Sequence, residues 1–175
     1  MRALIVGGGC RGLELARELG TEGHAVRVVT RSARGDEAIR AAGAEAWRGD
    51  PDRVGTLRYA LDNVTVLLWL LGTATGPRDK VAALHGSRLE MMLERTVDTT
   101  VRGVVYEAAG TLPADVFAAG IREIRRANER NEVPYALLKA DPRDRAAWLP
   151  AAREAVASLL GRRGISSAAS PPPAA

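Results

Sequence analysis

The chain has 175 residues, 46% of them hydrophobic and 26% charged, enough for one domain with a substantial core and too few for a comfortable second one. The net charge of +4 comes from basic residues that are scattered along the chain without interleaved aromatic residues, so we expect no nucleic-acid partner. The only cysteine, Cys10, excludes an intrachain disulfide and a metal site built from thiolates.

Apolar runs of strand length alternate with helix-period segments along the chain, which predicts an α/β fold with a doubly wound, six-stranded parallel sheet and helices on both faces. The predicted strands are 3–6, 25–30, 44–47, 64–71, 103–108 and 134–139. The predicted helices are 11–21, 36–42, 52–61, 78–96, 114–130 and 143–160. Asp50 and Pro51 are interpreted as the cap and first residue of the third helix. One domain is expected over 1–164, followed by a disordered Ser/Ala/Pro tail at 165–175.

A glycine motif follows the first predicted strand directly and opens the first helix. Gly7, Gly9 and Gly12 form GxGxxG, in which the glycines allow a tight turn, a close approach of the backbone to a pyrophosphate, and close packing of helix on strand. The helix N-terminus that follows, with Cys10 and Arg11, would receive the anion. The motif therefore predicts a dinucleotide-binding (Rossmann) domain.

The end of the second predicted strand indicates which dinucleotide is bound. Proteins that bind NAD normally place Asp or Glu there for the ribose hydroxyls, whereas this chain has Thr30, Arg31 and Ser32. Arg31 can pair bidentately with a 2′-phosphate and Ser32 can donate a hydrogen bond to it. These residues favour NADP(H) over NAD(H).

With these motifs, with Gly49-Asp50 after strand three and with Leu71-Gly72-Thr73 after strand four, the chain resembles the atypical short-chain dehydrogenase/reductases, particularly NmrA-like and epimerase-like proteins. The resemblance implies that Asp50 contacts the adenine and that Leu71 and Gly72 lie along the cofactor ribose. Two features depart from the family: Val6 stands where its GxxGxxG loop begins, and the serine expected after strand five is missing.

A YxxxK motif, as in short-chain dehydrogenases, is formed by Tyr135 and Lys139. The tyrosine acts there as general acid only if both residues share a helix face. Pro134 and Pro142 frame this segment as a strand, on which the two residues would stand about 13 Å apart. We therefore interpret the motif as a coincidence.

Three further residues are candidates for chemistry. Glu107, at the carboxyl end of strand five, is either a general base or an ion-pair partner, and the sequence leaves both open. His85 lies in a predicted helix, where a structural role is favoured over proton transfer. Cys10 is interpreted as a small loop residue, with a redox role as the alternative.

Two functions remain open at this level. The one we favour is an NADPH-dependent oxidoreductase acting on a small carbonyl-like substrate, and the alternative is a non-catalytic NADP(H)-binding redox sensor or regulator. A homodimer is expected because the fourth and fifth helices carry apolar stripes of the kind that the resembled family uses to dimerise. No signal peptide or membrane-spanning run is evident, so a cytoplasmic location is expected.

Overall fold

The computed structural model describes residues 1–161, and the predicted tail at 165–175 lies outside the described residues. All six predicted strands are present, and their ends differ from the prediction by at most two residues. The strands are β1 (Arg2–Gly7), β2 (Ala25–Thr30), β3 (Glu45–Arg48), β4 (Val66–Leu70), β5 (Gly103–Glu107) and β6 (Tyr135–Leu138). They pair in parallel in the order β3-β2-β1-β4-β5-β6, so the predicted doubly wound sheet is confirmed.

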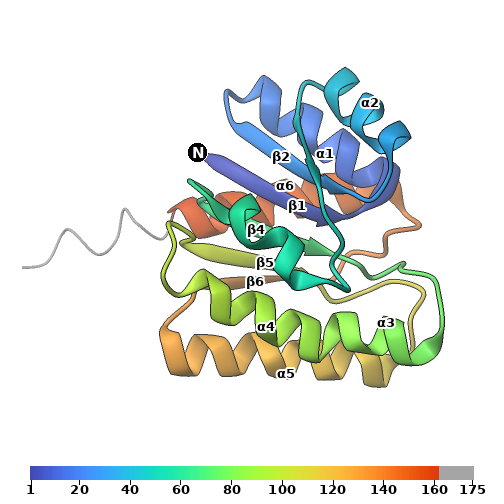
Figure 1. Cartoon of the computed structure of the whole chain (residues 1–175), viewed down its shortest axis with the longest axis vertical. Helices are drawn as coiled ribbons and strands as arrows, with labels where there is room; N and C mark the ends of the chain where they lie inside the picture. The colour runs from blue at the N-terminus through green and yellow to red at the C-terminus, as the bar shows by residue number, and fades with distance from the viewer. Residues whose placement is uncertain (162–175) are drawn as a thin grey trace, which may run out of the picture.

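Helices cover both faces of this sheet (Figure 1). The helices are α1 (Gly9–Thr21), α2 (Ala33–Ala41), η1 (Val54–Leu61), α3 (Arg78–His85), α4 (Ser87–Thr96), α5 (Ala114–Asn131) and α6 (Arg145–Gly161). One core layer joins the sheet to α1, α2 and α6, and the other joins it to η1, α4 and α5. None of the helices in residues 1–161 combines the length and the apolar character needed to cross a bilayer.

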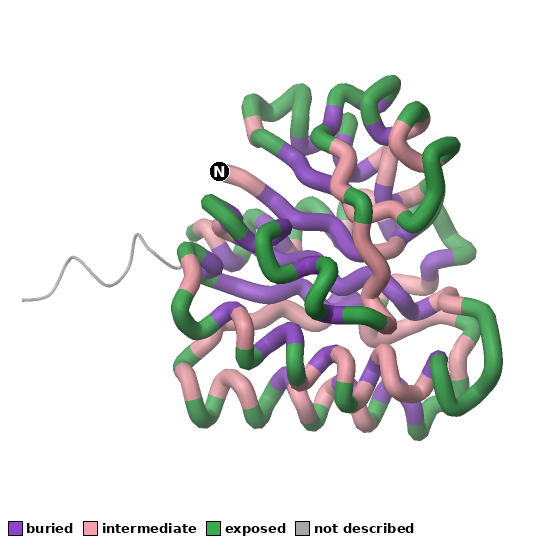
Figure 2. Tube along the Cα trace, in the orientation of Figure 1, coloured by how far each residue is buried: buried purple, intermediate pink, exposed green. Residues whose placement is uncertain are grey.

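The central strands are buried on both faces, as their continuous apolar sequence predicts. Every residue of β4 and β5 is buried, and the buried core runs along β1, β4 and β5 (Figure 2). Because the strands are parallel, their carboxyl ends meet at one edge of the sheet. The strand order reverses between β1 and β4, and at such a point open α/β sheets form a crevice outside the carboxyl ends of the strands.

The third predicted helix differs from the observed one in type and in start. It is a 3₁₀ helix that begins at Val54, and Asp50 does not cap it. Asp50 instead closes a turn, in which its Oδ1 accepts from the backbone N–H of Asp52 at 3.0 Å. Val54, Gly55 and Thr56 are all poor α-helix formers, which explains why this short segment stays 3₁₀.

The fourth predicted helix, 78–96, is two helices separated at Gly86, whose φ and ψ are −119° and −110°. Glycine has a low helix propensity, which permits the interruption. The break allows His85 to end α3 inside the core while Leu89 and Met92 of α4 bury on the sheet. A helical period in the sequence could not show this change of axis.

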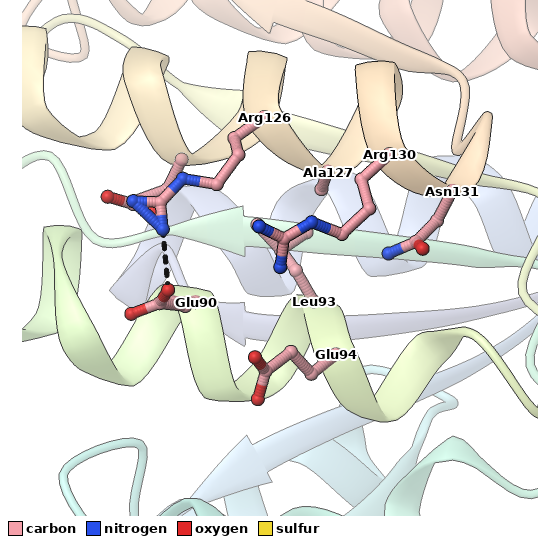
Figure 3. A pocket seen from close by; sticks show the side chains of 8 residues that line it. Glu90, Leu93, Glu94, Arg126, Ala127, Arg130 and Asn131 are labelled. Atoms are coloured by element: carbon pink, nitrogen blue, oxygen red, sulfur yellow. Dashed lines mark hydrogen bonds and ion pairs between the residues drawn. The ribbon is translucent and has the colours of Figure 1, made fainter.

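The apolar stripes of α4 and α5 face inward, which removes the basis of the dimer prediction. Met92, Leu93 and Ile124 are at most 3% exposed, and Met91 is the large apolar side chain that α4 leaves on the surface. The groove between the two helices is lined largely by charged residues, and Arg126 pairs across it with Glu90 at 2.7 Å (Figure 3). The homodimer stays a prediction.

Candidate nucleotide-binding cleft

A cleft of about 870 Å³ opens at the carboxyl edge of the sheet, which is within the usual size range of ligand sites. Its walls come from the ends of β1, β2 and β4, the loop after β3, and helices α1, α2 and α3. Eight of the predicted cofactor residues line it: Gly7, Gly9, Cys10, Thr30, Arg31, Ser32, Asp50 and Leu71. The cleft thus lies at the switch point between β1 and β4, where ligands of this fold bind.

The glycine loop has backbone conformations that residues with a Cβ atom rarely adopt. Gly7, Gly8 and Gly9 have φ values of +89°, +79° and +51°. A Cβ on Gly7 would lie 2.4 Å from the carbonyl oxygen of Leu70, so the loop is pressed against the end of β4. A Cβ on Gly9 would meet nothing within 4 Å and would project into open space, so this backbone is accessible to a ligand.

The N-terminus of α1 is prepared for an anion. Gly8 caps it without a side chain, and its first turn has no acidic residue. The first hydrogen bond of the helix runs from the N–H of Gly12 to the carbonyl of Gly8 at 3.0 Å, so the N–H groups of Gly9, Cys10 and Arg11 precede any intrahelical partner. Such a helix end favours a phosphate group.

The segment after β2 is held by hydrogen bonds and carries the unpaired cation of Arg31. Ser32 caps α2 by accepting from the N–H of Gly35 at 3.1 Å, which leaves its hydroxyl hydrogen available to donate. Arg48 holds this turn by donating to the carbonyl of Arg31 at 3.4 Å and to Asp36 at 2.9 Å. The exposed guanidinium of Arg31 pairs with no carboxylate in residues 1–161.

The opposite wall combines charged and apolar side chains. Asp52 lies between Arg88 at 3.1 Å and Lys80 at 3.6 Å, and hydrogen bonding from Arg88 lowers the pKa of Asp52. Val81 and Leu84 of α3 give this wall an apolar surface. The prediction missed these α3 residues, although a helix that follows a parallel strand necessarily begins at the ligand-binding edge of the sheet.

Three predicted cofactor residues do not line the cleft. Gly12 is buried against the loop, where a Cβ would lie 2.8 Å from the carbonyl oxygen of Gly7. The N–H of Gly72 donates to Glu107, and the guanidinium of Arg11 bonds the same carboxylate and the hydroxyl of Thr73. Gly12 therefore acts through packing, as the motif predicts, whereas Arg11 and Gly72 belong to a separate cluster.

Glu107 is fully buried and accepts three hydrogen bonds. Its Oε1 accepts from the indole N–H of Trp148 at 2.8 Å and from Arg11 at 3.3 Å, and its Oε2 accepts from Gly72 at 2.7 Å. Burial raises the pKa of Glu107, while the hydrogen bond from Gly72 and the charge of Arg11 oppose that rise. With both oxygens engaged outside the cleft, Glu107 has the geometry of an ion-pair partner and not of a general base.

His85 is also fully buried and bonded at both ring nitrogens. A carbonyl oxygen can only accept, so Nε2 carries the hydrogen and donates to Leu71 at 3.2 Å. The other nitrogen, Nδ1, then accepts from the hydroxyl of Tyr106 at 2.6 Å. Burial lowers the pKa of His85 and raises that of Tyr106. The histidine positions the end of β4 and does not line the cleft.

The YxxxK segment is an extended strand and not a helix, as predicted. Tyr135 begins β6 and Lys139 directly follows it, and β6 is in register with β5 along its length. On an extended strand the two side chains stand about 13 Å apart, too far for the lysine to lower the pKa of the tyrosine directly.

Cys10 is exposed in the cleft, at the N-terminus of α1.

Reductases and epimerases are among the solved structures that have a similar fold. A triphenylmethane reductase from Citrobacter sp., complexed with NADP(H), aligns with a TM-score of 0.61 at 19% identity, over 78% of this chain and 48% of that chain. A UDP-glucose 4-epimerase from Thermotoga maritima, solved with UDP-glucose, aligns with a TM-score of 0.67 at 14% identity, over 79% of this chain and 55% of that chain. The chain has a Rossmann fold, which it shares with these two proteins.

At these identities the likeness concerns the fold. The chain spans about half the length of these solved Rossmann proteins. It also aligns with vestitone reductase from alfalfa, at a TM-score of 0.58 and 12% identity, over 55% of the length of that chain. No protein-family model and no curated protein matches the sequence. The chemistry of this Rossmann domain therefore has to be argued from its own cleft.

Proposed function

We propose that the protein binds NADP(H) in the cleft at the carboxyl edge of its sheet. The observation that carries the proposal is the joint placement of the uncapped α1 N-terminus and the unpaired Arg31 in one cleft. The first provides N–H donors for a pyrophosphate and the second a cation for a 2′-phosphate. NADP(H), when bound, supplies hydride chemistry, and the protein supplies binding and orientation.

The preference for NADP(H) rests on the residues after β2. Arg31 and Ser32 line the cleft with a guanidinium and a hydroxyl, and no carboxylate stands among residues 30–35 to bind ribose hydroxyls. Arg48 fixes the backbone of this turn from β3 and so acts as a positioning residue. The matched solved structures contain both cofactors, NADP(H) in the triphenylmethane reductase and NAD in the UDP-glucuronic acid 4-epimerase, so the proposed preference rests on the residues after β2 alone.

Calorimetric titration with NADPH and NADH tests the proposal. We expect NADPH to bind more tightly, and Arg31→Ala to weaken NADPH by roughly 10- to 100-fold with little effect on NADH, since a charge-assisted bidentate pair contributes about 1.5–3 kcal/mol. Arg34→Ala is the matched control, because Arg34 is a neighbouring exposed arginine that does not line the cleft. Equal affinities for both dinucleotides, or an Arg31→Ala protein that keeps full NADPH affinity, would refute the preference.

The same cleft serves two possible roles, and its geometry favours a non-catalytic regulator. Both candidate acid–base residues, Glu107 and His85, are buried, are engaged in hydrogen bonds and do not line the cleft. The oxidoreductase role is supported by the fold shared with reductases, and hydride positioning alone would then have to drive it. NADPH turnover with a panel of small carbonyl substrates separates the two roles: tight binding without turnover supports the regulator.

A further inference from the structure

The cleft covers only part of the crevice that this fold offers to a dinucleotide. A Rossmann sheet has two mononucleotide-binding halves, and a dinucleotide lies across the switch point between them. The cleft wall comes from β1, β2, the loop after β3, the end of β4 with the segment that follows it, and helices α1, α2 and α3. Within residues 1–161, no residue of β5, β6 or the segments that follow them belongs to it.

The crevice above β5 is filled by side chains of the protein itself. Arg11 reaches from the start of α1 to Glu107 at 3.3 Å and to Thr73 at 3.4 Å. Its guanidinium carbon stands 5.2 Å from the ring centre of Trp148, which in turn bonds Glu107 at 2.8 Å. These side chains connect α1, β5 and α6, so they occupy the space between the elements that would enclose a second nucleotide.

The loops after β4 and β5 also lie directly against each other. The N–H of Thr111 donates to the carbonyl of Gly72 at 3.0 Å, and the N–H of Gly72 donates to Glu107 at 2.7 Å. A Cβ on Gly110 would lie 2.0 Å from the carbonyl oxygen of Gly72, and a Cβ on Gly72 would lie 2.2 Å from that of Ala109. No ring fits between two backbone segments in such contact.

The open part of the crevice matches the adenosine end of the ligand. Pro51, Val81 and Leu84 provide apolar surface for a base, Arg31 provides a cation beside the ribose position, and the glycine loop provides N–H groups for a 5′-phosphate. We propose that the cleft is a half-site for a 2′-phosphorylated adenosine nucleotide, which leaves the nicotinamide ring outside. The inference rests on the proposed NADP(H) binding and makes that binding independent of the redox state of the ring.

Calorimetry on the full chain with four probes tests the half-site: NADPH, NADP⁺, adenosine 2′,5′-bisphosphate and nicotinamide mononucleotide. We expect the first three to bind with Kd values within about threefold of one another, and the mononucleotide not to bind, because only the adenosine end makes contacts. A bisphosphate more than about 30-fold weaker than NADPH, or a tenfold difference between NADPH and NADP⁺, would overturn the half-site and leave NADP(H) binding intact. If none of the four binds, the proposed function fails as well.

Two variants locate the binding energy. Arg31→Ala should weaken NADPH and the bisphosphate by the same factor, because it contacts a group that both share. Lys139→Ala, at the exposed end of β6 in the closed half, should leave both Kd values unchanged. A loss of NADPH affinity in Lys139→Ala with the bisphosphate unaffected would instead place the nicotinamide end over β5 and β6, and would contradict the proposal.

Discussion

At the scale of single residues, substitution of Glu107 should be strongly destabilising, because three donors converge on its buried carboxylate. Glu107→Ala leaves the guanidinium of Arg11 without its counter-ion and two buried N–H groups without an acceptor. We expect the free energy of unfolding to fall by about 3–5 kcal/mol, as for other broken buried ion pairs. Urea denaturation followed by circular dichroism measures it.

Glu107→Gln is the matched control, since it keeps the volume and one acceptor oxygen while removing the charge. We expect a smaller loss, roughly 1–3 kcal/mol. A Glu107→Ala protein within about 1 kcal/mol of the wild type would show that the cluster contributes little to stability.

The burial of His85 predicts how the free energy of unfolding changes with pH. Burial lowers the pKa of His85, so below about pH 6.5 the unfolded chain binds a proton at this histidine that the folded protein does not bind. The free energy of unfolding should therefore fall as the pH drops below about 6.5, by up to about 1.4 kcal/mol per pH unit until the lowered pKa is reached. Urea denaturation at a series of pH values measures the slope.

The raised pKa of Glu107 acts in the opposite direction, because the folded protein then retains a proton above pH 4.5 that the unfolded chain has lost. The difference between wild type and His85→Gln, measured at each pH, isolates the histidine. A difference that does not change between pH 7 and pH 5.5 would contradict this role.

At the scale of elements, one buried arginine joins η1 to the sheet. Arg27 on β2 donates to the carbonyls of Ala60 at 2.6 Å and Asp62 at 3.3 Å, at the end of η1, and pairs with Glu45 at 2.9 Å. Arg27→Met should lower the free energy of unfolding by about 2–3 kcal/mol, because the carbonyls lose a charged donor. Chemical denaturation of the variant measures the loss.

Arg2 provides the control for this prediction, since it pairs with the same Glu45 from a position where its side chain is 34% exposed. Arg2→Met should cost about 0–1 kcal/mol, as exposed ion pairs usually do. Equal losses in the two variants would mean that burial of Arg27 and its bonds to η1 add nothing.

The glycine loop allows a second test at this scale. Gly9→Ala adds a methyl group in open space at a φ of +51°, whereas Gly7→Ala drives one into the carbonyl of Leu70. We expect Gly9→Ala to fold with a loss of about 1–2 kcal/mol and to lose NADPH affinity, because the methyl group keeps the phosphate from the backbone. Calorimetry should show this loss, and unchanged NADPH binding would place the phosphate elsewhere.

At the scale of the whole molecule, ligand binding should stabilise the folded state, because the cleft exists only there. NADPH at 100 times its Kd adds about 2.7 kcal/mol to the free energy of unfolding, which raises Tm by roughly 5–10 °C for a chain of this length. Thermal denaturation with adenosine 2′,5′-bisphosphate at the same multiple of its own Kd should give the same shift. A shift with NADPH alone would contradict the half-site.

The order of elements and the glycine loop were predictable from the sequence because their signals are local. A buried strand such as β4 is a continuous apolar run, and the positive φ values at Gly7 and Gly9 require glycine at those positions. The replacement of an acidic residue by Arg31 at the end of β2 is local too, and parallel strands bring that position to the same edge as the loop.

Which of the predicted site residues face the cleft depends on the packing of distant segments. Arg11 and Glu107 are 96 positions apart, and Trp148 lies a further 41 positions along the chain, so no spacing in the sequence could show that they meet and close half of the crevice. The same holds for His85, whose orientation depends on the break at Gly86 and on the hydroxyl of Tyr106. The fold and the phosphate loop were predictable because the backbone conformation of a turn and the burial pattern of a strand depend on neighbouring residues in the sequence. The extent of the site was decided by side chains packed from distant elements.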